Sequence, residues 1–157
     1  MMTKSTQFSE KDISQITTYQ SGIVQASAHR VVNRVVSDFL LRYDMTAMQW
    51  FTIGAVHDAG KNGIRLSDLT RRLDTTLPYV TNVINLLESK SMVNKVTHSG
   101  DSRIKLVSIV PEFVSTVQEI EIELREHLRA VLYRDNQISR DELQNYISVL
   151  YKIAHSQ

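Results

Sequence analysis

Residues 66–109 read LSDLTRRLDTTLPYVTNVINLLESKSMVNKVTHSGDSRIKLVSI, and the period of the apolar residues changes within this segment. The first part has apolar residues at helical spacing over residues 68–74 and again over about 77–90. The second part has two short β-branched runs, 92–96 and 104–109, on either side of a glycine. These patterns predict two helices joined by a turn and followed by a two-stranded hairpin.

Both predicted helices begin at residues suited to that position. Ser67 is predicted to cap the first helix and Thr75 or Thr76 the second, with Pro78 in its first turn, where a missing N–H costs little. The second helix has an apolar side that we expect to be buried, formed by Val80, Val83, Ile84 and Leu87. Two short helices joined by a tight turn form a helix-turn-helix, and the hairpin makes it winged.

The outward side of the second helix carries uncharged side chains that form hydrogen bonds. Asn82 and Asn85 have the amide group that binds adenine through two hydrogen bonds, and Thr81 can contact a base, a thymine methyl group or a phosphate. A solvated helix surface is the alternative interpretation of these polar residues. The remaining residues of this predicted DNA-contact side are Thr76, Pro78 and Tyr79.

The formal net charge is only +1, but charge is unevenly distributed along the chain. Residues 61–105 hold eight basic and four acidic residues, whereas residues 111–157 hold five basic and eight acidic ones. A basic middle segment indicates a surface for an anionic polymer, and ordinary scatter of charges is the alternative. The basic side chains that we expect to contact phosphates or to supply positive field are Arg71, Arg72, Lys90, Lys95 and Lys105.

Helical patterns also flank this segment, so the predicted fold class is mainly α with a small β-hairpin wing. Four further helices are predicted, over residues 9–43, 47–59, 111–133 and 140–154. Ser9 is the predicted N-cap of the first. The pairs Thr46 with Gln49 and Ser139 with Glu142 have the spacing of capping boxes, which place helix starts after Thr46 and Ser139.

The composition excludes several classes of site. The chain has no cysteine, so it can hold no disulfide, thiolate metal site or cysteine nucleophile. The five histidines are scattered without a His-x-x-x-His pair, and we expect neither a metal nor another cofactor. The densest carboxylate group, within residues 119–126, lies off the apolar stripe of its helix, and we do not expect an enzyme. No segment is apolar enough for a membrane span, so we expect a cytoplasmic protein.

Five motifs follow one another in the centre of the chain: Met45-Thr46-Ala-Met-Gln49-Trp50, Leu69 to Leu73, Val80-Thr81, Leu87-Glu88-Ser-Lys90-Ser-Met-Val93 and Asp101-Ser-Arg103. Their order and spacing resemble those of the MarR family of winged helix-turn-helix transcription regulators. The resemblance covers about residues 45–110 by motif and the rest of the chain by the order of its helices.

The resemblance implies a winged helix-turn-helix DNA-binding lobe at 45–110 and a helical dimerisation region at 1–44 and 111–157. The apolar sides of the flanking helices would interlock with those of a second subunit, so we expect a homodimer that binds a pseudo-palindromic site on double-stranded DNA and represses transcription. In the wing, Arg103 matches the family's arginine that enters or lines the minor groove, and Asp101 matches the aspartate that orients it. A surface Asp–Arg turn pair without a DNA role is the alternative.

The resemblance also implies a candidate effector cleft, because many relatives release DNA when an anion or aromatic acid binds between the dimer helices and the DNA-binding lobe. The residues in segments that border such a cleft are His29, Arg30, Arg34, Tyr43, Trp50 and His57. Cations beside aromatic rings suit a small aromatic or anionic ligand, whereas core packing and solvent exposure are the alternatives. In one departure from the family, Ser91 stands where glycine is usual, so we expect the second helix to end differently.

A second class of function remains open. The near-neutral net charge and the uncharged outward side of the second helix also fit a winged helix that binds other proteins and no specific DNA. A steep loss of DNA affinity with added salt would distinguish a DNA-binding protein from such an interaction module.

Overall fold

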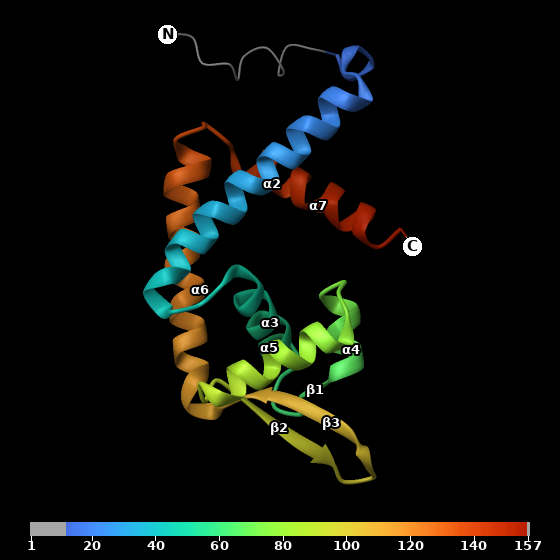
Figure 1. Ribbon diagram of the computed structural model, residues 1–157. Coiled ribbons are helices and arrows are strands. Elements are labelled where there is room, and N and C mark those ends of the chain that lie inside the picture. Colours follow the sequence, from blue (N-terminus) through green and yellow to red (C-terminus); the bar gives the residue numbers. More distant parts are fainter. Residues whose placement is uncertain (1–11, 157) are drawn as a thin grey trace. The chain divides into compact units, whose positions relative to one another are not determined.

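The computed structural model describes residues 12–156 (Figure 1). The chain divides into two compact units, Met1–Val35 and Val36–Gln157, and helix α2, Thr18–Leu40, runs across the division. In the first unit a 3-10 helix, Ile13–Gln15, precedes α2. The carboxylate of Asp12 caps this short helix by accepting a hydrogen bond from the backbone N–H of Ser14 at 2.8 Å.

The first long helix is shorter than predicted. Ile16 is extended, and α2 begins at Thr18 instead of continuing from residue 9. Oγ1 of Thr17 accepts a hydrogen bond from the N–H of Gln20 at 3.2 Å, and Oε1 of Gln20 accepts one from the N–H of Thr17 at 3.1 Å. This reciprocal pair satisfies backbone donors at a helix start, so a new helix begins here. The predicted N-cap Ser9 lies outside the described residues.

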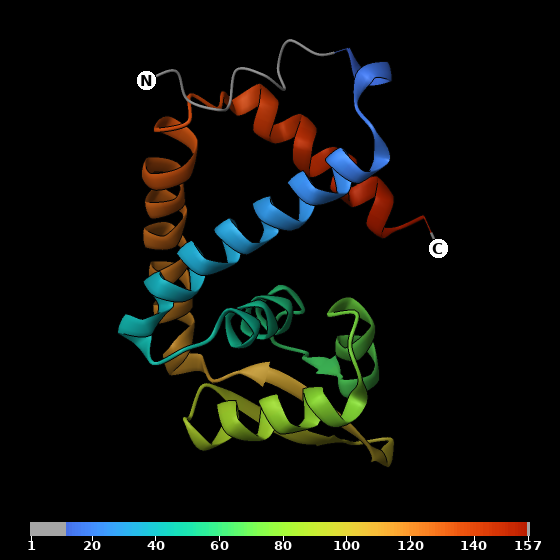
Figure 2. The same ribbon diagram turned by 45° about the horizontal axis from the view of Figure 1, so that its top comes forward.

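The second unit contains the predicted helix-turn-helix and wing (Figures 1 and 2). After the end of α2 and a 3-10 helix, Leu41–Tyr43, its elements are α3 (Ala47–Asp58), β1 (Ile64–Arg65), α4 (Leu66–Arg72), α5 (Leu77–Ser89), β2 (Val93–His98) and β3 (Asp101–Ile109). The strands form an antiparallel sheet in the order β1-β3-β2, against which α3 and α5 pack. The prediction of a mainly helical fold with a small β wing is confirmed.

The core of the winged helix is apolar and close to fully buried. The four residues predicted for the buried side of α5, namely Val80, Val83, Ile84 and Leu87, are all buried. Ile53 of α3, Leu69 of α4 and Val107 of β3 belong to the same core and have no exposed surface. Burial of this kind is what holds α5 in place, because burying one such side chain stabilises the fold by about 1.5–3 kcal/mol.

Two local predictions in this segment are wrong, and a third is confirmed in position only. Ser67 does not cap α4, because β1 pairs with β3 as far as Arg65 and the helix starts directly at the end of that strand. Thr76 is the N-cap residue of α5, as predicted, although its side chain makes no capping hydrogen bond. The wing strands are longer than the runs 92–96 and 104–109, because backbone pairing continues past the β-branched residues to His98 and Asp101.

The remaining helices follow the wing. A 3-10 helix, Pro111–Phe113, leads into α6 (Val114–Leu128), a π-helical segment (Arg129–Arg134) and α7 (Arg140–Ala154). Helix α6 buries Val117, Ile120 and Leu124, and the wider π-helical turn makes Leu132 the next buried residue. Both predicted capping boxes, at the starts of α3 and α7, are present.

None of the helices within residues 12–156 is both long and apolar enough to cross a membrane. In the same part of the chain, no three His, Asp or Glu side chains are grouped so that they could hold a metal ion. The division into a lobe at 45–110 and a dimerisation region at 1–44 and 111–157 stays a prediction.

Candidate nucleic-acid interface

The side of α5 opposite its buried residues is exposed along the helix. Pro78 lies in the first turn, as predicted, and the Tyr79 side chain beside it is 42% exposed. The hydroxyl of Thr81 donates a hydrogen bond to the carbonyl oxygen of Leu77 at 2.8 Å, so it can only accept further hydrogen bonds. The amide of Asn82 is exposed and has no hydrogen-bond partner within residues 12–156.

Asn85, Glu88 and Lys95 form a polar cluster, here called the helix–wing clamp, which joins α5 to β2. Nζ of Lys95 donates a hydrogen bond to Oδ1 of Asn85 at 2.5 Å and lies 3.6 Å from Oε1 of Glu88. The backbone N–H of Lys95 donates to Oε2 of Glu88 at 3.1 Å. Because an ammonium group only donates, the oxygen of the Asn85 amide must face Lys95.

The wing tip presents Arg103 to solvent. The Asp101 carboxylate accepts a hydrogen bond from the backbone N–H of Arg103 at 2.9 Å, and its Oδ1 lies 3.7 Å from Nε of the same residue. The Arg103 side chain is 92% exposed, so this weak ion pair leaves the guanidinium available. On the same strand Nζ of Lys105 donates to Oγ1 of Thr97 at 2.6 Å.

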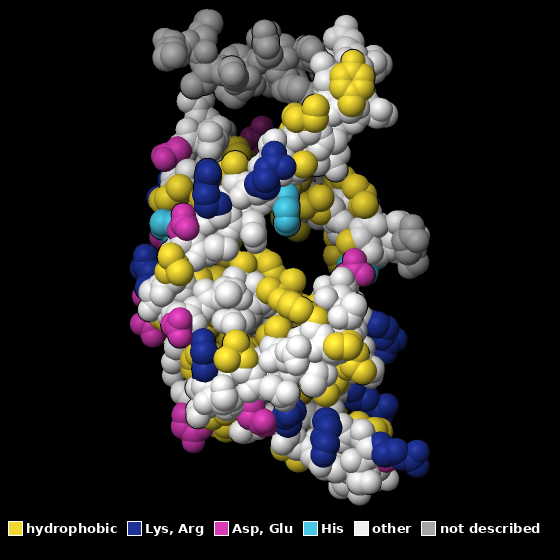
Figure 3. Space-filling view, in the orientation of Figure 1, with side chains coloured by type: hydrophobic (Ala, Val, Ile, Leu, Met, Phe, Trp, Pro, Cys, Tyr) yellow, Lys and Arg dark blue, Asp and Glu magenta, His cyan; other side chains and the backbone are white. Residues whose placement is uncertain are grey.

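The remaining predicted cations of the winged helix lie on α4. Arg71 forms an ion pair with Asp68 one turn earlier, and its side chain is still 78% exposed. Arg72 is exposed as well. Figure 3 shows Lys and Arg side chains gathered over the wing and the neighbouring edge of the winged helix. The structure therefore brings the cations of α4 and the wing to one end of the second unit.

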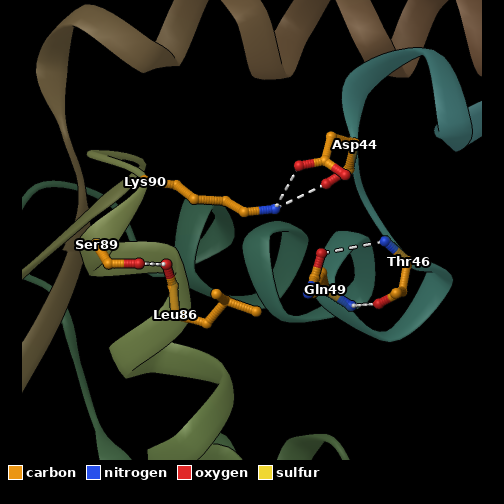
Figure 4. A network of polar contacts seen from close by, with 6 residues as sticks. All are labelled: Asp44, Thr46, Gln49, Leu86, Ser89 and Lys90. Carbon is orange, nitrogen blue, oxygen red and sulfur yellow. Dashed lines mark hydrogen bonds and ion pairs between the residues drawn. The ribbon is translucent and has the colours of Figure 1, made fainter.

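Lys90 follows α5 directly and points toward the segment that precedes α3 (Figure 4). Its Nζ donates a hydrogen bond to the carbonyl oxygen of Asp44 at 2.8 Å and lies 3.3 Å from Oδ2 of the same residue. Asp44 is in the left-handed conformation, with φ 50°. Lys90 is one of the cations predicted to contact DNA. In the structure it caps the end of α5, and its ammonium group is bound to the backbone carbonyl of Asp44.

The end of α5 differs from the expectation based on Ser91. Ser91 has φ 60°, which is the left-handed conformation that glycine adopts at such positions. The N–H of Ser91 donates to the carbonyl of Glu88 at 3.0 Å, and the N–H of Met92 donates to that of Leu87 at 3.0 Å. This is the Schellman pattern, so the helix ends in the usual way despite the serine. The prediction of a different helix end was wrong, because two backbone hydrogen bonds outweigh the strain.

A comparison with protein-family models matches the segment that carries these features. Residues 43–104 match a model of the MarR family. The chain has a winged-helix fold, and its residues 43–104 are similar to the MarR family. The match begins just before α3 and ends within β3, so it covers the helix-turn-helix and most of the wing. No curated protein matches the chain in sequence.

Solved MarR-family structures share the fold over most of their length. The S. aureus MepR–DNA complex is 22% identical with a TM-score of 0.71, and the alignment covers 90% of this chain and 99% of that one. A MarR-family regulator from Rhodococcus sp. RHA1 is 12% identical with a TM-score of 0.79, covering 91% and 98%. Bordetella bronchiseptica BpsR, whose DNA binding is regulated by 6-hydroxynicotinic acid, is 18% identical with a TM-score of 0.75, covering 94% and 99%.

Two of the six predicted effector residues line one pocket. Trp50 is buried, with 8% of its surface exposed, and His57 is half-buried beside it. The pocket is also lined by Phe51, Arg71 and Arg125. Sequence reasoning missed Arg125 as a pocket residue, because its spacing from Glu121 indicates only a helix-surface ion pair.

The other four effector candidates lie elsewhere. The Tyr43 hydroxyl donates a hydrogen bond to Oε2 of Glu123 at 2.7 Å, and this bond raises the pKa of Tyr43 above its ordinary value. His29, Arg30 and Arg34 are exposed residues of α2 in the first unit. Their proposed participation in an effector site stays a prediction.

Proposed function

We propose that the chain is a DNA-binding transcription regulator that acts as a homodimeric repressor on a pseudo-palindromic operator. The observation that carries this proposal is the exposed outward side of α5, with a free amide at Asn82, next to a wing whose Arg103 side chain is 92% exposed. The similarity of the fold to MepR, which has been solved in complex with DNA, supports the same assignment.

Each part of the interface has a physical role in this proposal. Helix α5 enters the major groove, where Asn82 contacts a base edge. Arg103 enters the flanking minor groove, whose negative potential attracts arginine when the groove is narrow. Arg71, Arg72 and Lys105 contact phosphates or supply positive field, and their effect decreases with added salt.

The homodimer is proposed from the exposed apolar side of α7. The structure buries no residue of α7, and its apolar residues are about half exposed. Those that share one side are Tyr146, Ile147, Leu150 and Tyr151, with exposed fractions of 49%, 53%, 40% and 64%. A contiguous apolar side of this kind is stabilised by a second subunit, and two-fold symmetry then presents two α5 helices to two half-sites.

A small aromatic or anionic effector is proposed for the pocket that Trp50 and His57 line. Arg71 and Arg72, which also line it, provide cations for a carboxylate, and Phe51 provides an aromatic surface. BpsR, whose DNA binding responds to 6-hydroxynicotinic acid, supports this class of ligand. Because Arg71 and Arg72 belong to both the pocket and the predicted phosphate contacts, a bound anion would compete with DNA for them.

Selection of sites from random duplex DNA tests the proposed function. Selected duplexes would be measured by fluorescence anisotropy with the full chain at several salt concentrations. We expect an inverted repeat with half-sites about 10–10.5 bp apart, because two α5 helices meet successive major grooves. Affinity should fall steeply with added salt. If no sequence is enriched and binding to duplexes is weak, the interaction module without specific DNA binding is the better assignment.

A further inference from the structure

Helix α5 has no cation with which to recognise guanine. Glu88 is the only charged residue between Leu77 and Ser89. Arginine and lysine are the side chains that most often recognise guanine, because they donate hydrogen bonds to its O6 and N7 atoms. A helix without either side chain therefore lacks the usual donor for a G·C pair.

Both oxygens of the Glu88 carboxylate face Lys95 of the wing. A carboxylate recognises cytosine by accepting a hydrogen bond from its N4 amino group. Oε2 of Glu88 already accepts a hydrogen bond from the backbone N–H of Lys95 at 3.1 Å, and Oε1 lies 3.6 Å from Nζ of Lys95. The helix–wing clamp thus occupies the one acidic side chain of α5.

The same clamp removes Asn85 from base reading. To bind adenine through two hydrogen bonds, an asparagine accepts from N6 with Oδ1 and donates to N7 with Nδ2. Oδ1 of Asn85 is bound to Nζ of Lys95 at 2.5 Å, so the adenine amino group would meet an ammonium group that also donates. Asn85 and adenine are therefore mismatched as long as the clamp is formed.

Asn82 carries the side-chain amide of α5 that remains. Its amide has no partner within residues 12–156, whereas Thr81 and Ser89 donate their hydroxyl hydrogens to carbonyl oxygens of their own helix at 2.8 and 2.6 Å. The exposed apolar surfaces of Pro78 and Tyr79 lie on the same outward part of the first turns. Apolar side chains contact the thymine methyl group, and an asparagine amide matches adenine.

We propose that α5 selects A·T base pairs in the major groove, with Asn82 reading adenine and the clamp of Asn85, Glu88 and Lys95 holding these three residues out of base recognition. This inference rests on the proposed DNA-binding function. The inference adds two points that the similarity to the MarR family leaves open: the class of base pair that α5 accepts, and the residue that selects it.

The test compares the base preferences of variants with those of the natural protein, using duplexes with a randomised core. The variants are Asn82→Ala, Asn85→Ala, Asn85→Asp and the control Asn145→Ala, which removes an exposed amide on the side of α7 opposite its apolar residues. We expect A·T pairs at the α5 contacts of the natural protein. Asn82→Ala should lose adenine preference at one position per half-site, by about 5- to 150-fold. Asn145→Ala should select the same sites as the natural protein.

Variants of Asn85 test whether this residue reads a base or belongs only to the helix–wing clamp. Asn85→Asp keeps an acceptor for Lys95 but cannot donate a hydrogen bond to adenine N7. If Asn85 read adenine, this substitution would therefore abolish the adenine preference. We expect Asn85→Ala and Asn85→Asp to keep the base preferences of the natural protein. Enrichment of G·C pairs at the α5 contacts, or a changed preference in either Asn85 variant, would overturn the inference while leaving the proposed function intact. Absence of salt-dependent binding to any duplex would overturn both.

Discussion

Ser91 holds a backbone conformation that costs an L-residue free energy. Its φ of 60° lies in the left-handed region, where a side chain raises the energy by about 1–2 kcal/mol and glycine has no such penalty. Glycine also loses more chain entropy on folding, which offsets part of that gain. We expect Ser91→Gly to raise the free energy of unfolding by about 0.5–1 kcal/mol, measured by urea denaturation.

The matched control is the same change two residues earlier. Ser89 lies within α5, where glycine should lower the free energy of unfolding by about 0.5–1 kcal/mol. A loss of stability in both variants would show that Ser91 is not strained.

Arg103 is the residue on which the proposed role of the wing depends. Its guanidinium is held only by a 3.7 Å ion pair to Asp101, so it is free to enter a groove. We expect Arg103→Ala to weaken binding to a selected duplex at physiological salt while sedimentation shows an unchanged dimer. Arg134→Ala removes the same charge outside the winged helix and should leave affinity nearly unchanged. If Arg103→Ala and the natural protein bound the duplex with equal affinity, the proposed contact of the wing with DNA would be wrong.

At the scale of elements, Lys90 joins the end of α5 to the segment before α3. Since its Nζ bonds to the carbonyl oxygen of Asp44, we expect it to support the helix and not to neutralise a phosphate. Lys90→Met should lower the free energy of unfolding by about 1 kcal/mol or less and leave the salt dependence of DNA affinity unchanged. Lys105→Met, by contrast, should reduce that salt slope by about one. Titrations of both variants at several salt concentrations compare the slopes, and a reduced slope for Lys90→Met would place Lys90 on a phosphate.

The hydrogen bond from Tyr43 to Glu123 joins the 3-10 helix Leu41–Tyr43, which follows α2, to α6. It raises the pKa of Tyr43 above its ordinary value of 10.0, so the folded state keeps the phenol proton more strongly than the unfolded chain does. The stabilisation is present below that value and is lost as pH rises through the higher folded pKa. We expect the free energy of unfolding to fall more steeply above pH 10 in the natural protein than in Tyr43→Phe. Parallel pH curves from urea denaturation would show that this hydrogen bond is absent in solution.

At the scale of the whole molecule, the apolar side of α7 should decide the oligomeric state. Ile147 is 53% exposed, and a carboxylate at its position would be costly to bury against a second subunit. We expect Ile147→Asp to sediment as a monomer and to bind a selected inverted repeat much more weakly, because only one half-site is then engaged. Asn145→Asp places the same charge on the opposite side of α7 and should remain dimeric. If the Ile147→Asp protein were still a dimer, the dimer interface would not include the apolar side of α7.

Features that depend on neighbours along the chain could be predicted from the sequence. The buried side of α5 follows from the spacing of Val80, Val83, Ile84 and Leu87, because helical geometry places residues three and four apart on one side. The capping boxes at Thr46 and Ser139 follow in the same way, since each needs only a partner three residues later. The order of these elements, together with the MarR-like motifs, was enough to predict the winged helix.

Contacts between distant residues were decided by the tertiary structure alone. Lys90 and Asp44 are 46 positions apart, and Tyr43 and Glu123 are 80 positions apart, so no local pattern pairs them. The sequence shows Lys95 only as a basic residue of the predicted wing. The packing of β2 against α5 brings its ammonium group to the amide of Asn85, and we infer that this contact keeps the amide from reading a base. Local periodicity is set by backbone geometry. The partner of a polar side chain, by contrast, depends on which elements the core brings together. These tertiary contacts therefore determine which polar groups remain free to contact DNA.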